Sequence, residues 1–118
     1  MAYVDGFVIP VPKRKVKAYI KMAREGFRMW RKHGALDYKE CVADDLEPAG
    51  MPAGFPKLAR LKPGETVVFS YIVYRNRAHR DSVNKKVMKE MAALGGSPKD
   101  MPFDLKRMAC GGFKVVVG

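Results

Sequence analysis

Residues that commonly bind metals are rare in this sequence. It contains two cysteines and two histidines among 118 residues, and they do not have the ligand spacing of a structural or catalytic zinc site. Neither a Ser-His-Asp nor a Cys-His arrangement can be argued from their positions. We therefore expect no metal site and no cofactor.

Long apolar stretches are also missing. No apolar run approaches the ~20 residues that a membrane-spanning helix needs. The first residues, Met-Ala-Tyr-Val-Asp-Gly, lack the basic region and apolar core of a signal peptide. These absences predict a cytoplasmic protein without membrane association, in which Cys41 and Cys110 stay reduced.

Acidic residues are scarce relative to basic ones. The chain has 12 Asp and Glu against 23 Lys and Arg, a net charge of +11. Such a charge permits binding to polyanions but carries no information about the fold. The 47% hydrophobic and 30% charged residues are typical of a globular protein. We expect one folded domain over residues 1–118.

Residues 65–74, Glu-Thr-Val-Val-Phe-Ser-Tyr-Ile-Val-Tyr, form the most apolar stretch. The residue types are β-branched or aromatic, which predicts a strand after the turn at Pro63-Gly64. A strand with one wet face would alternate apolar and polar residues, and this one does not. Its pattern indicates a strand with both faces covered.

The other elements follow from periodicity and from proline and glycine positions. They are a strand over 3–11, a helix over 15–33, a more polar edge strand over 36–43, a helix over 76–94 and a strand over 108–117. The stretch 45–64 is a long loop rich in Pro, Gly and Ala, which is either a functional lid or an insertion.

The order strand, helix, strand, strand, helix, strand predicts an α+β fold. With right-handed crossovers it becomes a ferredoxin-like βαββαβ arrangement: a four-stranded antiparallel sheet with two helices on one face and the first and third strands central. The other sheet face, carrying either Phe69 and Tyr71 or Val68 and Ile72, then has no covering layer. A bare apolar face of that size predicts a homodimer, sheet against sheet, forming a dimeric α/β barrel.

The same topology argues against a disulfide. Cys41 on the second strand and Cys110 on the fourth would lie at opposite edges, roughly three strand spacings of ~4.8 Å apart. Disulfide geometry requires Cα atoms within about 7 Å. We expect both to be free thiols.

Asp5 is the first candidate site residue, because a carboxylate inside a central strand is costly unless it is paired or hydrogen-bonded. Asp104, Lys106 and Arg107 come just before the last strand, which neighbours the first in this topology. One interpretation is an ion pair of Asp5 with Arg107 or Lys106. The other is a pocket around these four residues that binds a small polar or anionic ligand.

Tyr38 and Glu40, on the edge strand, are expected at the surface or at an interface. His33, at the end of the first helix, is interpreted as a C-terminal residue stabilised by the helix dipole rather than as a catalytic base.

A stripe of cations runs along the first helix: Lys17, Lys21, Arg24, Arg28 and Arg31. It is either a solvated face or a surface for non-specific, salt-dependent contact with nucleic-acid phosphates. RNA-recognition modules share this strand and helix order and stack bases on sheet aromatics. The third strand lacks their basic-Gly-aromatic-Gly opening, and a dimer would bury the sheet face. Nucleic-acid binding through the sheet is therefore not favoured.

Four separated blocks resemble one known family. They are Tyr3-Val4-Asp5-Gly6-Phe7-Val8, His33-Gly34-Ala35-Leu36, Val67-Val68-Phe69-Ser70-Tyr71, and Met101-Pro102-Phe103-Asp104-Leu105-Lys106-Arg107-Met108 followed by Gly111-Gly112-Phe113. Together with residues 80–88 of the second helix, they are similar to the YbaA-like family of bacterial domains of unknown function. The resemblance covers essentially the whole chain and implies the dimeric α/β-barrel fold, without a catalytic mechanism. Leu105 and Cys110 depart from the family pattern, which usually has glycine and an aromatic residue there.

Three hypotheses about function follow. The first is a homodimeric α/β-barrel protein of unknown activity with a small-ligand pocket in each subunit. The second is a basic RNA- or DNA-associating protein that uses its helical face. The third is a non-catalytic structural or partner-binding dimer. Whether the chain is an enzyme stays open at this point.

Overall fold

The computed structural model describes residues 1–47 and 49–118. Its elements in chain order are β1 (Tyr3–Pro12), α1 (Val16–Lys32), β2 (Asp37–Val42), α2 (Phe55–Leu58), β3 (Glu65–Tyr74), α3 (Arg77–Leu94) and β4 (Ala109–Lys114). The predicted order is confirmed, and β3 has the predicted bounds. The short helix α2 lies in the stretch predicted as a loop over 45–64, of which Pro48 is outside the described residues.

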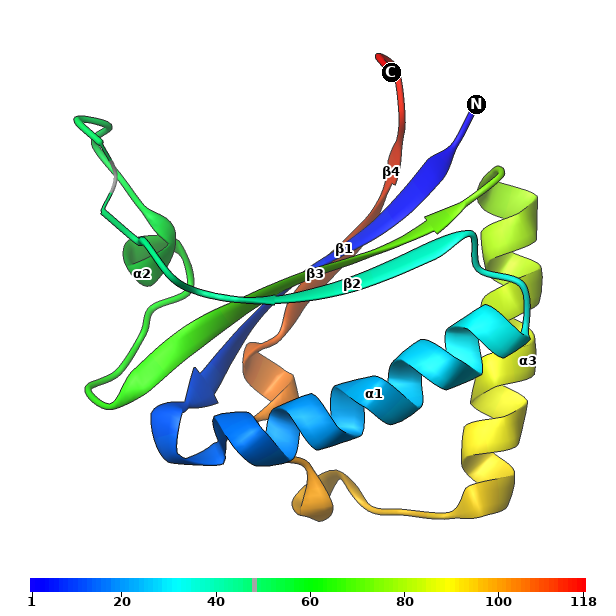
Figure 1. Cartoon of the computed structure of the whole chain (residues 1–118), viewed down its shortest axis with the longest axis horizontal. Helices are drawn as coiled ribbons and strands as arrows, with labels where there is room; N and C mark the ends of the chain where they lie inside the picture. The colour runs from blue at the N-terminus through cyan, green and yellow to red at the C-terminus, as the bar shows by residue number, and fades with distance from the viewer. Residues whose placement is uncertain (48) are drawn as a thin grey trace.

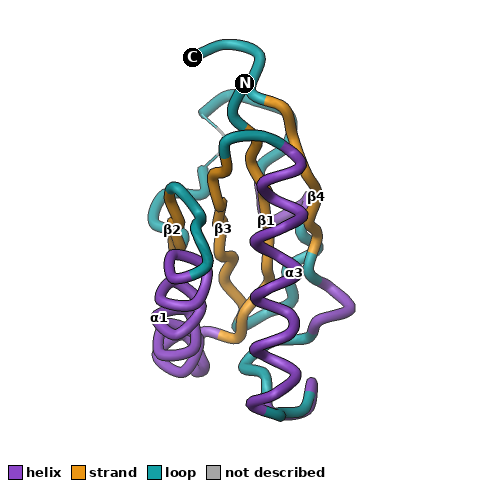
Figure 2. Tube along the Cα trace, turned by 90° about the vertical axis from the view of Figure 1, so that its right-hand side faces the viewer, coloured by secondary structure: helices purple, strands orange, loops and turns teal. Residues whose placement is uncertain are grey.

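The four strands form one antiparallel sheet in the order β2-β3-β1-β4 (Figure 2). As predicted, β1 and β3 are central and β2 is an edge strand. The register places Tyr38, Ile72, Asp5 and Gly112 side by side in one row across the sheet. This α+β arrangement is the predicted ferredoxin-like fold.

Both long helices cover the same face of the sheet (Figure 1). Tyr19 of α1 belongs to a core cluster with Val68 of β3, and Val83 of α3 belongs to a cluster with Ile72 of the same strand. Val68 and Ile72 are an even number of residues apart and therefore point to one face. The prediction of two helices on one face is confirmed.

The buried stripe of α1 differs from the one that hydropathy suggests. A stripe through Val16, Ile20, Ala23, Phe27 and Trp30 would bury Phe27, yet that side chain is exposed and the buried residues are Tyr19 and Ala23. The stripe is rotated because the Tyr19 hydroxyl has a hydrogen-bond partner in the interior, which lets this amphipathic residue be buried.

Helix α3 begins at a side-chain cap and runs at a steep angle to α1 (Figure 1). The Asn76 Oδ1 accepts a 2.8 Å hydrogen bond from the His79 backbone N–H, the usual N-cap geometry. Hydropathy predicts a buried stripe through Val83, Val87, Met91 and Leu94, and of these four Val83 and Val87 are buried whereas Met91 and Leu94 are exposed. The second half of α3 therefore extends away from the sheet (Figure 1).

The opposite face of the sheet has little cover. Phe69 of β3 is 44% exposed and Phe113 of β4 is 63% exposed. Phe55 of α2 packs beside Phe69, with their ring centroids 6.2 Å apart. Of the two sets named from the sequence, the Phe69 and Tyr71 set is on the uncovered face.

Cys41 lies on β2 and Cys110 on β4, the two edge strands, and both are free and exposed. The expectation of free thiols is confirmed. None of the described helices is long and apolar enough to cross a membrane.

Candidate ligand-binding site

A cavity of about 490 Å³ lies between the sheet, α1, α3 and the segment that leads into β4. Most of its wall is apolar and rich in sulfur and aromatic rings. The methionines are Met22, Met29, Met88, Met91, Met101 and Met108, and the aromatic residues are Phe7, Tyr19, Trp30, Tyr38 and Phe103. Such flexible thioether side chains adapt to ligands of irregular shape.

Asp5 is at one polar end of this cavity and is only 6% exposed. Its Oδ1 lies 3.5 Å from Arg80 Nη1, and its Oδ2 accepts a 3.4 Å hydrogen bond from Asn84 Nδ2. Both distances are at the long end for charge-assisted hydrogen bonds, which are usually 2.7–2.9 Å for such ion pairs. The carboxylate is therefore paired loosely.

Asn84 is oriented by donors on two other elements. Its Oδ1 accepts from Trp30 Nε1 at 3.0 Å and from the Tyr74 hydroxyl at 3.1 Å. Since an indole N–H can only donate, the amide oxygen must face Trp30 and the NH₂ group must face Asp5. Burial, followed by the charge of Asp5, raises the pKa of Tyr74, so its hydroxyl stays a proton donor.

Arg80 links this group to the first strand. Its Nη2 donates to the Tyr3 hydroxyl at 3.1 Å, and its guanidinium carbon lies 5.0 Å from the centroid of the Tyr3 ring, a cation–π distance. Its Nε lies 3.0 Å from Asp81 Oδ1, within ion-pair range, but is buried without a hydrogen bond of acceptable angle. Arg80 therefore has remaining donor capacity.

A glycine makes room for Tyr3. A Cβ atom on Gly112 would lie 2.3 Å from the Tyr3 hydroxyl oxygen and under 3 Å from two atoms of its ring. Glycine within a strand often marks a close approach to the backbone. At Gly112, the Tyr3 side chain makes that approach.

Glu40 is the centre of a second polar group on the cavity wall. Its Oε1 accepts a 2.7 Å hydrogen bond from the Tyr19 hydroxyl, and its Oε2 accepts a 2.6 Å bond from the Tyr38 hydroxyl. Burial first, and then the hydrogen bond to Glu40, raise the pKa of both tyrosines. In the described part of the chain, no Lys, Arg or His nitrogen forms an ion pair with Glu40.

The residues predicted to share a pocket do not come together. Asp5 lines the cavity, but Asp104, Lys106 and Arg107 do not. Asp104 Oδ1 accepts a 3.0 Å hydrogen bond from the Lys106 backbone N–H and caps the 3₁₀ turn over 105–107. Arg107 pairs with Glu65 at 2.5 Å and donates to the Arg60 carbonyl at 2.8 Å.

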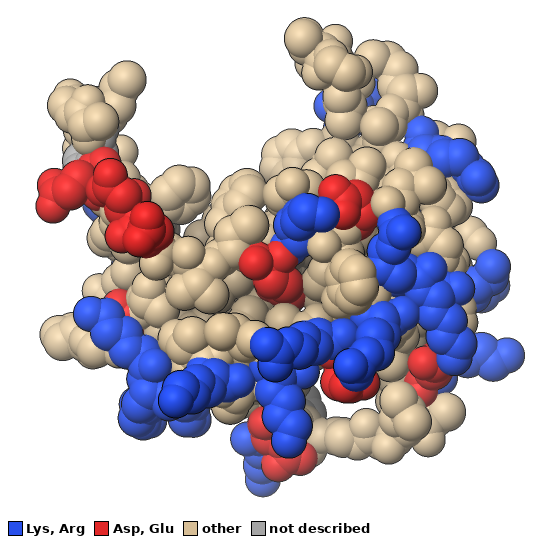
Figure 3. Space-filling view, viewed as in Figure 1, with Lys and Arg blue, Asp and Glu red and all other residues tan. Residues whose placement is uncertain are grey.

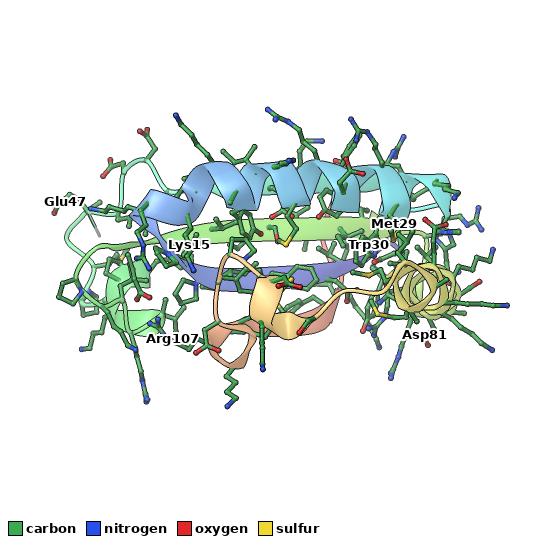
Figure 4. The ribbon with its side chains drawn as sticks, turned by 90° about the horizontal axis from the view of Figure 1, so that it is seen from below. Lys15, Met29, Trp30, Glu47, Asp81 and Arg107 are labelled. Atoms are coloured by element: carbon green, nitrogen blue, oxygen red, sulfur yellow. The ribbon has the colours of Figure 1, made fainter. Side chains whose placement is uncertain are left out.

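The predicted ion pair of Asp5 with Arg107 or Lys106 is thus wrong, and the strand register explains it. Asp5 is opposite Gly112, whereas Val8 is opposite Ala109. Residues before Ala109 therefore lie near the far end of β1, and the Arg107 side chain is remote from Trp30 and α3 (Figure 4). Lys106 and Arg107 instead line a smaller cavity of about 330 Å³ beside Arg60.

Several cavity residues were missed from the sequence. Tyr38 and Glu40, expected at the surface or an interface, lie on the inward face of β2, because α1 covers this edge strand. Tyr38 and Glu40 are two residues apart on a strand, so their side chains point to the same face, and this spacing could have indicated a shared inward position. Arg80 and Asn84 are one helical turn apart, beside Val83 and Val87, and polar residues at that spacing next to a buried stripe could have indicated an interior network.

Leu105 and Cys110, the two departures from the family pattern, both line the cavity. A family glycine and aromatic residue at these places would give the cavity a different shape.

The cationic stripe of α1 is exposed along its whole length. Lys and Arg side chains form a band over this helix and the adjoining end of α3 (Figure 3). Arg28 pairs with Glu25, and Arg31 donates to the carbonyls of Ala35 and Leu36. Among the described residues, no cluster of three or more His, Cys, Asp or Glu could hold a metal ion.

Comparisons with known proteins agree with this fold. The chain is 41% identical to the uncharacterized protein YbaA of Escherichia coli K12 over 119 residues, covering 99% of this chain and 98% of the relative. It is equally similar to YbaA of Shigella flexneri. A crystal structure of a dimeric ferredoxin-like protein from an uncultured marine organism matches with a TM-score of 0.51 and 12% identity, covering 100% of this chain and 99% of that one. This last likeness supports the fold alone.

The model of the protein family of unknown function DUF1428 matches residues 2–105. Together with the identity to YbaA over nearly the full length, this match shows that the chain belongs to the DUF1428 family.

Proposed function

We propose that this protein binds a small organic molecule, with an apolar body and a polar end, in the cavity between the sheet, α1 and α3. The observation that carries the proposal is a mainly apolar cavity of about 490 Å³ with Asp5, Arg80 and Asn84 converging at one end. Cavities of roughly 300–1,000 Å³ with few, well-placed polar groups are the usual form of small-molecule sites.

The polar end has spare hydrogen-bonding capacity. Asp5 is paired at long distances, 3.5 Å from Arg80 Nη1 and 3.4 Å from Asn84 Nδ2. Buried polar groups usually have partners, so a ligand that supplies one would gain affinity there. Binding is proposed here, without a reaction.

Trp30 is the single tryptophan of the chain and lines the cavity. Titration with the neutral apolar dye N-phenylnaphthylamine should quench Trp30 emission saturably, with one site per subunit. Met88→Glu, which adds a charge to the cavity wall, should weaken binding about tenfold, or ~1.4 kcal/mol. Met51→Glu, at an exposed methionine outside the cavity, is the matched control. Quenching without saturation, or equal affinity in all three proteins, would contradict the proposal.

We also propose that two copies assemble through the uncovered sheet face. Phe69 and Phe113 are exposed there, and Phe55 extends the patch. Large exposed apolar patches usually mark interaction sites, and the same patch on both copies suits a two-fold axis. The fold neighbour described as dimeric is consistent with this.

Light scattering during size-exclusion chromatography tests the dimer. The unaltered protein should have the mass of two chains, and Phe69→Asp should shift it to one. Leu94→Asp, at an exposed apolar residue on α3 outside the sheet, should leave the dimer intact. A single-chain mass for the unaltered protein would overturn the proposal.

We further propose that the protein is cytoplasmic and that Cys41 and Cys110 are reduced there. Both thiols are exposed, and thiols stay reduced in the cytoplasm. Thiol labelling of freshly opened cells under denaturing conditions should modify both without prior reduction.

A second candidate function is non-specific nucleic-acid binding by the cationic stripe of α1. The continuous band of Lys and Arg in Figure 3 supports it. Binding of a labelled single-stranded RNA should then weaken steeply with salt, and Lys17→Glu with Lys21→Glu should reduce it further. No binding at low salt would exclude this function.

A further inference from the structure

We infer that the cavity selects organic cations, with the ligand's ammonium group held by Glu40 among the rings of Tyr19, Tyr38 and Trp30. This inference rests on the proposed function and names the class of ligand. It starts from the charges on the cavity wall, which are opposite in sign to the charge of the whole chain.

Among the described residues that line the cavity, three are carboxylates, Asp5, Glu25 and Glu40, and Arg80 is the one with a basic side chain. Arg80 is paired with Asp5, and the exposed Glu25 is paired with Arg28. Glu40 is left without a cationic partner. In a chain of net charge +11, the cavity therefore has a net negative wall.

The two tyrosines orient the Glu40 carboxylate without neutralising it. Each oxygen accepts one phenolic O–H, at 2.7 Å from Tyr19 and 2.6 Å from Tyr38. An ionised carboxylate can accept about four hydrogen bonds, so about two positions remain. Charged groups in partly buried sites are stabilised by an opposite charge, and a ligand ammonium would provide one.

The two tyrosines that contact this carboxylate each pack against a second aromatic ring of the cavity wall. The centroids of Trp30 and Tyr38 are 5.9 Å apart, and those of Tyr19 and Phe103 are 5.7 Å apart. Trp30 and Met29 lie on the part of α1 nearest α3 (Figure 4). Ammonium groups bind favourably to the faces of such rings, with Trp the best of them. The combination of rings and one unpaired carboxylate favours a cation over a neutral group.

The strand register gives the distance between the two polar groups of the cavity. Glu40 of β2 is opposite Ser70 of β3, and Asp5 of β1 is opposite Ile72 of β3. The two carboxylates are thus on the strands that flank β3. Two strand spacings and one two-residue step place their Cα atoms roughly 12 Å apart. A ligand with its ammonium at Glu40 could thus reach Asn84 and Arg80 with an acceptor at its other end.

The external cations do not cancel this preference. The stripe of α1 is exposed to water, where charges are screened over about 8 Å at physiological salt. Lys39, next to Glu40 in sequence, points to the opposite sheet face and pairs with Asp37. An anionic ligand, in contrast, would have to compete with Asp5 for Arg80.

Trp30 fluorescence tests the inference with three ligands of one shape: phenylbutylammonium, phenylbutanol and phenylbutyrate at neutral pH. The ammonium should bind at least about tenfold more tightly than the alcohol, and the carboxylate should bind most weakly. Glu40→Gln should lower the affinity for the ammonium to about that for the alcohol, and so remove the preference. Glu25→Gln, at the wall carboxylate already paired with Arg28, is the matched control and should keep the preference.

Equal affinity for ammonium and alcohol, or tighter binding of the carboxylate, would overturn the inference while the proposed function stands. If none of the three ligands binds and the neutral dye also fails, the proposed function falls as well. Since selectivity is measured first on the unaltered protein, instability of Glu40→Gln does not prevent the test.

Discussion

A Cβ atom on Gly26 would lie 2.6 Å from the hydroxyl oxygen of Tyr38. Glycine inside a helix costs about 1 kcal/mol relative to alanine, so this position gives up helix stability. In return, the Tyr38 hydroxyl approaches the backbone of α1 and donates to Glu40. The helix and the edge strand are thus fitted to each other at the cavity wall.

Gly26→Ala should therefore destabilise the protein by about 1 kcal/mol, because the overpacking cost of ~1–3 kcal/mol exceeds the gain in helix propensity. Urea unfolding measures the change. In the Tyr38→Phe protein, which lacks the clashing oxygen, Gly26→Ala should cost much less than it does in the parent. A Gly26→Ala protein as stable as the parent would show that Tyr38 moves freely.

Gly112→Ala should cost about 2 kcal/mol. The added methyl would clash with the Tyr3 ring itself, which cannot shift without weakening its contact with Arg80. Gly111→Ala is the matched control, since the nearest atom to its Cβ would be on Phe113 at 3.8 Å, an ordinary contact. Equal unfolding free energies for the two variants would contradict this explanation.

Asn84→Leu should destabilise the protein by ~1–3 kcal/mol, because Trp30 Nε1 and the Tyr74 hydroxyl both lose their acceptor. The change should also shift the Trp30 emission maximum, which a purely remote effect would not do. Lys85→Leu, at the adjacent exposed position of α3, should alter neither quantity. An unchanged emission spectrum in Asn84→Leu would exclude the hydrogen bond to Trp30.

The pair of Glu65 and Arg107 should make stability depend on acid pH. The hydrogen bond from Arg107 lowers the pKa of Glu65 from its ordinary value of 4.5. A carboxyl with a lowered pKa in the folded state stabilises fully above its unfolded pKa, and this contribution disappears as the pH falls through the folded value. Glu65→Gln should therefore have a flatter profile of melting temperature between neutral pH and about pH 3.

Calorimetric melts of the two proteins across this range measure the difference. Because the Glu65 side chain is partly exposed, the effect on stability should be modest. If the two profiles stayed parallel down to the lowest pH, the pair would make no pH-dependent contribution.

The position of the charged partners shows where sequence reasoning stops. Asp5 was recognisable as a carboxylate that needs a partner, since its strand is otherwise apolar. Its partner could not be identified from the sequence, because two arginines were possible. Arg107 comes just before β4, and Arg80 lies in α3, which follows β3. The register of β1 with β4 decides it: Gly112, not Arg107, is opposite Asp5.

The hydropathy pattern of the sequence could not predict the cavity either. Hydropathy predicts that Met91 and Leu94 continue the buried stripe of α3, but the helix leaves the sheet before them. The direction of a helix depends on how bulky side chains such as Trp30 pack between it and its neighbour, which is a non-local property. Tyr38 and Glu40 became wall residues because α1 crosses the edge strand on which they lie.

By itself, the sequence determined the strands, the helices, their order and the two-sided apolar character of Glu65 to Tyr74, because these follow from local periodicity and from turn residues. It also determined that one sheet face would lack a helical layer. Only the tertiary structure decided that Phe69 is on that face, that Arg80 is the partner of Asp5, and that Glu40 is on the cavity wall. These depend on strand register and helix packing, which bring together residues far apart in the chain.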